Sequence, residues 1–112
     1  MAYDEALAER IRDLLAPRDD VTEQKMFGGI AFMVGGRMAV GVVQDDLMVR
    51  VGPNAHDDAV ARPHVRAMDF TGRPMRGFVY VAPRSVVNDE DLAGWVEAGA
   101  AFAASQPPKE RR

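Results

Sequence analysis

The sequence contains few side chains whose type and spacing would support catalysis or metal binding. It has no cysteine, which excludes a disulfide framework, a thiolate metal site and a cysteine nucleophile. The nearest approach to a metal cluster is the run His56, Asp57 and Asp58, but adjacent helical positions point about 100° apart and cannot close on one ion. Ser85 and Ser105 lack the strained turn that exposes a nucleophilic serine. We therefore expect no enzyme activity, no catalytic residue, no metal site and no cofactor.

Two short segments, residues 25–29 (KMFGG) and 72–77 (GRPMRG), are the least generic parts of the chain. Glycine supplies unusual backbone angles, proline fixes φ, and arginine offers paired donors to an acidic partner. Two interpretations stay open: tight strand connections with solvated cations, or functional loops on a rigid scaffold. The candidate interaction or ligand surface comprises Lys25, Phe27, Gly28, Gly29, Phe32, Arg50, Arg73, Met75 and Arg76.

The overall charge and hydropathy narrow the function classes further. The chain carries a formal net charge of −3 at pH 7, and its pI is about 5.3. Duplex-DNA binders usually carry a basic face and a high pI, so we expect no direct sequence-specific binding to nucleic acid. No secretory signal and no apolar run of membrane-spanning length is present. We expect a cytoplasmic protein with no membrane partner.

The apolar pattern predicts an α+β domain with the element order α-β-β-β-β-α-β-β-α. The helices are expected at residues 4–16, 53–60 and 89–105, and the strands at residues 21–27, 30–34, 37–44, 47–51, 67–71 and 76–82. Asp4 and Asn88 are predicted to cap the long helices. The 112 residues fit one domain, residues 1–106, followed by a polar tail, residues 107–112. We expect an antiparallel sheet of about six strands with the helices mainly on one face.

Two-residue turns at residues 35–36 and 45–46 predict which strand residues share a face of this sheet. Both central positions of a type I′ turn need positive φ, which the two glycines at 35–36 allow. With these turns, the predicted core face comprises Ala31, Met33, Met38, Val40, Val42, Leu47, Val49 and Val51. The second face comprises Ile30, Phe32, Val34, Arg37, Ala39, Gly41, Val43, Met48 and Arg50.

This second face is too apolar to stay in contact with water. We expect a second copy of the chain to cover it, in a two-fold homodimer with Phe32 at the contact. The competing possibility is that the 53–60 helix or the 61–66 loop folds over the same face within one chain.

Three segments and the closing helix resemble the N-terminal domain of the TfoX/Sxy family. The segments are MAYDEALAERIRDLLAP, KMFGGIAFMVGGRMAVGVVQDDLMVRV and FTGRPMRGFVYV, and the helix places Trp95 ahead of SQPPK. The resemblance covers nearly the entire chain and implies a two-layer sandwich similar to that of secretion chaperones, often dimeric. Full-length members resemble regulators of natural competence in bacteria, which act with the cyclic-AMP receptor protein at promoters. They carry a helical C-terminal domain, and we expect this chain to be a stand-alone member without it.

Two function hypotheses follow from these observations. The first is a non-enzymatic regulatory or protein-interaction module of the competence or transcription-regulator type, with itself and a transcription factor or other protein as partners. The alternative is a protein that binds a small anion, or a small enzyme, with a cationic pocket formed by Lys25, Arg50, Arg73 and Arg76. Convergence of these four cations would favour the alternative, and their dispersal would favour the first hypothesis.

Overall fold

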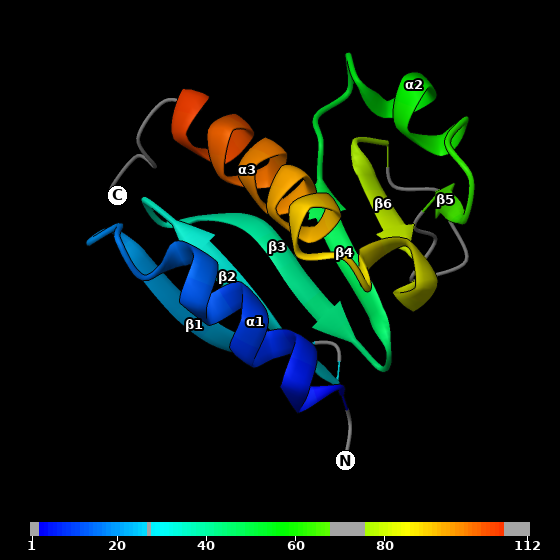
Figure 1. Cartoon of the computed structure of the whole chain (residues 1–112). Coiled ribbons are helices and arrows are strands. Elements are labelled where there is room, and N and C mark those ends of the chain that lie inside the picture. The colour runs from blue at the N-terminus through cyan, green and yellow to red at the C-terminus, as the bar shows by residue number, and fades with distance from the viewer. Residues whose placement is uncertain (1–2, 27, 68–75, 107–112) are drawn as a thin grey trace.

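A six-stranded antiparallel sheet with the described helices on one face forms the framework of the molecule (Figure 1). The computed structural model describes residues 3–26, 28–67 and 76–106. Its elements are α1 (Glu5–Leu15), β1 (Val21–Met26), β2 (Gly29–Val34), β3 (Arg37–Val43), β4 (Asp46–Arg50), α2 (His56–Val60), β5 (Val65–Ala67), β6 (Phe78–Val81), a 3₁₀ turn η1 (Pro83–Val86) and α3 (Asp89–Ser105). The strand order is β1-β2-β3-β4-β6-β5. The expected fold class and element order are confirmed.

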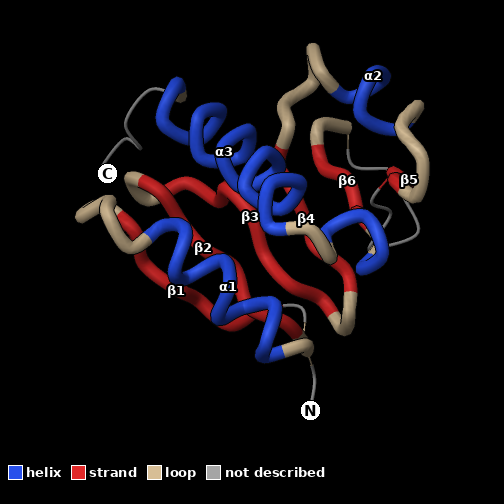
Figure 2. The backbone as a smooth tube through the Cα atoms, viewed as in Figure 1, coloured by secondary structure: helices blue, strands red, loops and turns tan. Residues whose placement is uncertain are grey.

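The two long helices begin where their predicted caps stand. The Asp4 carboxylate accepts a hydrogen bond from the backbone N–H of Leu7 at 3.1 Å, and the Asn88 side chain accepts one from Glu90 at 2.7 Å. These bonds satisfy backbone donors that have no partner inside the helix. In the view of Figure 2, α1 lies in front of β1 and β2, and α3 lies in front of β3 and β4.

The first hairpin turn is confirmed and the second is displaced by one residue. Gly35 and Gly36 have φ values of 60° and 83°, as a type I′ turn requires. The β3–β4 turn instead centres on Gln44 and Asp45, with Gln44 at φ 55°, so that Val42 pairs with Leu47. Each residue of β3 therefore pairs with a residue of β4 two positions away from its predicted partner, and a shift of two leaves each side chain on its expected face.

A β-bulge in β3 makes part of the face prediction wrong. Phe32 pairs with Val40, but the next residue of β2, Met33, pairs with Met38, so Ala39 is an extra residue in β3. One extra residue reverses the alternation of one strand relative to its neighbour. The residues of β2, and Met38 beyond the bulge in β3, therefore point to the faces opposite to those predicted.

The helix-covered face holds the hydrophobic core. Its strand residues are Ile30, Phe32, Val34, Ala39, Val40, Val42, Leu47, Val49, Val79 and Val81. The opposite side carries a smaller group, which we call the open-face cluster: Met48 and Tyr80, with Met38, Val43 and Phe78 packed against them. Phe32 has no exposed surface, so its predicted place at a dimer contact is wrong, as is that of Ile30, Val34 and Ala39. Gly41, Val43 and Met48 are on the second face as predicted.

The segment between β4 and β6 departs most from the predicted element boundaries. Helix α2 begins at His56 rather than at residue 53, and β5 begins at Val65, inside the expected loop. Residues 68–71 of the predicted strand lie outside the described residues, as do Phe27, Arg73, Met75 and the 107–112 tail.

Candidate functional site

Two of the predicted cations, Lys25 and Arg50, lie far apart on the sheet. Lys25 is exposed on β1, an edge strand. It pairs with Ile30 of β2, which pairs with Val42 of β3, which in turn pairs with Leu47 of β4, so Lys25 and Leu47 lie level with each other across the sheet. Arg50 lies three residues further along β4, so strand spacings of about 4.8 Å and rises of about 3.3 Å put the two Cα atoms roughly 17 Å apart. A common anion pocket of these two residues is therefore not formed.

Arg76 is held by a carboxylate of the neighbouring helix. Two of its guanidinium nitrogens lie 3.2 and 3.3 Å from the two carboxylate oxygens of Asp57 in α2. This pairing lowers the pKa of Asp57 and raises the pKa of Arg76, in each case mainly through the hydrogen bonds between them. Both side chains are exposed, so the pair joins α2 to the start of β6 at the surface.

Arg50 occupies an aromatic environment at the end of β4. Its guanidinium carbon lies 5.5 Å from the centre of the Phe78 ring and 5.1 Å from that of Phe102 in α3. Burial lowers the pKa of Arg50, and the nearby charge of Arg37 lowers it further. Cation–π contacts with two rings compensate for part of the lost hydration. Arg50 therefore helps to pack the end of the sheet against α3.

The two glycines of the 25–29 segment have backbone roles. Gly28 has φ +76°, in the region that L side chains rarely adopt. A Cβ on Gly29 would overlap the carbonyl oxygen of Val42. The tight-connection interpretation accounts for both residues, which let β1 turn into β2 close to β3.

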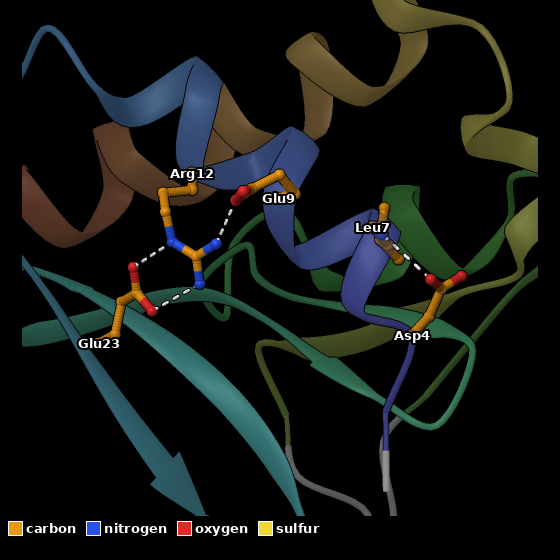
Figure 3. Close-up of polar contacts among 5 residues, drawn as sticks. All are labelled: Asp4, Leu7, Glu9, Arg12 and Glu23. Atoms are coloured by element: carbon orange, nitrogen blue, oxygen red, sulfur yellow. Dashed lines mark hydrogen bonds and ion pairs between the residues drawn. The ribbon is translucent and has the colours of Figure 1, made fainter. Parts of the chain in front are cut away.

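Arg12 connects α1 to the edge of the sheet, as Figure 3 shows. Its guanidinium nitrogens pair with the two oxygens of Glu23 on β1 at 2.6 and 2.8 Å, and also with Glu9. The hydrogen bonds from Arg12 lower the pKa of Glu23. The cluster fixes α1 over β1.

His56 has a structural partner. It is buried, and its Nδ1 atom accepts a hydrogen bond from the backbone N–H of Gly77 at 2.9 Å. A nitrogen that accepts in this way carries no proton. His56 therefore anchors α2 to the start of β6. In the described part of the chain, no group of three or more His, Cys, Asp or Glu residues could hold a metal ion.

The open-face cluster lies on the side of the sheet opposite the described helices. Met48 and Tyr80 form its buried centre, and Met38, Val43 and Phe78 are partly exposed around it. At its β5 margin, Arg66 lies 4.7 Å from the centre of the Tyr80 ring and pairs with Asp46 at 2.8 Å. This surface combines flexible thioethers and aromatic rings with one charge of each sign.

A second feature, which the sequence patterns did not reveal, is a hollow between α2 and α3. Its volume is about 210 Å³, and it is lined by Val51, Ala55, Asp58, Ala59, Arg62, Gly94, Trp95 and Ala98. The guanidinium of Arg62 lies 4.2 Å from the centre of the Trp95 ring. The only local signal in the sequence is Gly94, a glycine inside a predicted helix.

None of the described helices is long and apolar enough to cross a membrane. In comparisons with known proteins, no curated protein and no solved structure matches the chain. The TfoX N-terminal domain family does match, over residues 13–103. That range runs from within α1 to within α3 and includes all six strands. The chain therefore belongs to the TfoX N-terminal domain family.

Proposed function

We propose that this protein is a non-enzymatic, regulatory protein-interaction module that acts through the open face of its sheet in the cytoplasm. The observation that carries the proposal is the contrast between the two sides of the sheet. The described helices all pack on one side, whereas the open-face cluster on the other side has no described helix over it. Met38, Val43 and Phe78 are partly exposed here, and an exposed apolar patch is a typical site of protein association.

The side chains of this face suit a protein partner. Methionines such as Met33 and Met38 adapt their shape to a neighbouring surface. Ala31 and Gly41 are buried beneath these side chains, and the methyl end of Met48 lies over Gly41. The lowered pKa values of Glu23 and Asp57 both arise mainly from hydrogen bonds to an arginine, Arg12 and Arg76 respectively, and ion pairs of this kind also form in purely structural settings.

The partner that fits this face best is a second copy of the chain. The neighbouring pair Arg66 and Asp46 places both signs of charge on it. Two copies related by a two-fold axis can then meet without placing like charges opposite each other. In this dimer, the open-face cluster of each copy covers that of the other.

Light scattering at micromolar concentration tests the dimer. We expect the wild type to be a dimer and Met38→Glu to be a folded monomer, because a charge within an apolar contact disrupts it. Ala101→Glu is the matched control, since Ala101 is exposed on α3, on the other side of the sheet, and should stay dimeric. A monomeric wild type, or a dimer that survives Met38→Glu, contradicts the proposal.

Family membership supports a regulatory role of the competence or transcription-regulator type, with a transcription factor or other protein as the further partner. Deleting the gene and profiling transcripts tests this role. We expect a limited set of transcripts to change, with wild type restoring them and Met38→Glu failing to do so. An unchanged profile contradicts a regulatory role. Restoration by both proteins would show that the regulation does not act through the open face.

The alternative, an anion-binding protein or enzyme with a pocket formed by Lys25, Arg50, Arg73 and Arg76, receives less support. Lys25 and Arg50 lie on separate strands, and Arg76 is already paired with Asp57. Arg73 lies outside the described residues.

A further inference from the structure

The hollow between α2 and α3 has an apolar wall and a charged rim. Val51, Ala55 and Ala59 line one side, and Trp95 and Ala98 line the other. A second, smaller hollow of about 170 Å³ lies against the same Trp95 ring, bounded by Arg62, Pro63, Ser85 and Asp91. Because Arg62 and Trp95 border both hollows, they are the central residues of this region.

Gly94 is a second feature of the same region. A glycine inside a helix is less favourable than alanine by about 1 kcal/mol. Packing explains Gly99 of the same helix, because a Cβ there would lie 2.5 Å from the carbonyl oxygen of Ala39. A Cβ on Gly94 would meet nothing within 4 Å. The space above Gly94 belongs to the larger hollow, and the glycine keeps it open.

The rim carries one positive and one negative group, four residues apart. Among the described residues, neither Asp58 nor Arg62 takes part in an ion pair. The guanidinium of Arg62 is stacked on the Trp95 ring. A stacked guanidinium still has the N–H donors along its edge, and this edge matches the two oxygens of a carboxylate.

We propose that this hollow binds a small apolar α-amino acid. Its carboxylate pairs with the edge of Arg62, its ammonium group pairs with Asp58, and its side chain enters the hollow beside Trp95 and above Gly94. A ligand with only one of the two charges leaves either Asp58 or Arg62 without a partner. The site is separate from the open face, so it does not depend on the proposed function.

Trp95 is the only tryptophan of the chain, so its fluorescence reports directly on this hollow. We expect L-leucine to change the emission in a saturable way, with a Kd of about 1 mM or below. Two compounds of similar shape serve as ligand controls: isocaproate lacks the amino group, and isoamylamine lacks the carboxylate. We expect each to bind at least tenfold more weakly than L-leucine.

Variants locate the binding. Gly94→Leu should fill the hollow and abolish the response to L-leucine, whereas Ala101→Leu, at an exposed position of α3 that lines neither hollow, should retain it. Arg62→Ala should weaken binding at least tenfold, and Arg84→Ala, which removes a charge outside both hollows, should leave it unchanged. Circular dichroism checks that each variant is folded.

Three outcomes overturn the proposal. The first is the absence of any response to L-leucine at about 10 mM, well above the expected Kd. The second is equal binding of isocaproate or isoamylamine, which would remove the role of the paired charges. The third is unchanged binding by a folded Gly94→Leu variant, which would place the ligand elsewhere.

Discussion

The two faces of the sheet are built from alternate residues of the same strands, yet they differ in kind. The covered face carries mainly branched aliphatic side chains such as Val40, Val42 and Val49, all without exposed surface. The open face carries methionine, glycine and aromatic residues, among them Met48 and Tyr80. Branched side chains have few rotamers and suit one fixed packing, whereas methionine adapts to different neighbours. The comparison indicates that the covered face provides stability, and the adaptable side chains of the open face suit the contact that we propose for it.

The largest effect is expected from a charge on the covered face. Val42→Asp should destabilise the fold by several kcal/mol, because it buries a carboxylate without a partner. Val43→Asp is the matched control, since Val43 is the next residue along β3 and lies on the open face, partly exposed. Thermal unfolding followed by circular dichroism measures both. Equal losses would contradict the distinction between the faces.

A smaller loss is expected where α3 meets the covered face. Gly99→Ala should destabilise the protein by about 1–3 kcal/mol, because the added methyl group would push α3 away from Ala39 and the side chain of Val40. Urea unfolding gives the change in free energy. An unchanged free energy of unfolding would mean that the atoms around Gly99 move aside for the methyl group more easily than their close contacts indicate.

The outer side of α3 should respond in the opposite direction. Gly94→Ala should stabilise the protein by up to about 1 kcal/mol, because alanine favours the helix and the added methyl group meets nothing. The same urea measurement applies, with Gly99→Ala as its counterpart on the same helix. A loss of stability in Gly94→Ala would show that this position is packed.

The smallest effect is expected at the border of the covered face, where Arg12 pairs with Glu23. Glu23→Gln should lower the free energy of unfolding by about 0.5 kcal/mol at neutral pH, because both side chains are over a third exposed. The folded state lowers the pKa of Glu23, so the pair stabilises the fold above the ordinary carboxyl range. This contribution is lost as the pH falls through the lowered pKa. Urea unfolding at a series of pH values should show the free energies of unfolding of the wild type and Glu23→Gln becoming equal in acid. A difference that does not change with pH would show that it does not come from the ionised Glu23 carboxylate.

The elements of the fold could be predicted because their signals are local. Asp4 and Asn88 cap helices through bonds to residues two or three positions away, and the glycines at 35–36 adopt the φ values that their turn requires. The face of β2 could not be predicted in the same way. It depends on the bulge at Ala39, and alanine is an ordinary strand residue that gives no sign of an unpaired position.

The candidate sites were harder to predict because distant residues form them. Arg62 and Trp95 are far apart in the sequence and meet only because α2 and α3 pack on the same side of the sheet. The cations at Lys25 and Arg50 looked similar in the sequence, but the sheet separates them by three strand spacings. Residue type indicated which side chains could bind, whereas the strand order decided which of them meet.

The bulge at Ala39 also has a consequence for how this domain tolerates changes in length. Removing one residue from most surface loops alters only the loop. Removing Ala39 would take out the extra residue and keep Met33 opposite Met38 and Phe32 opposite Val40, so that the attached β1–β2 hairpin would keep both of its faces. Position 39 is therefore a place inside the sheet where the chain can lose one residue without moving a side chain to the other face. In comparing homologous chains, a gap at this position would signal a regular strand with the same two surfaces.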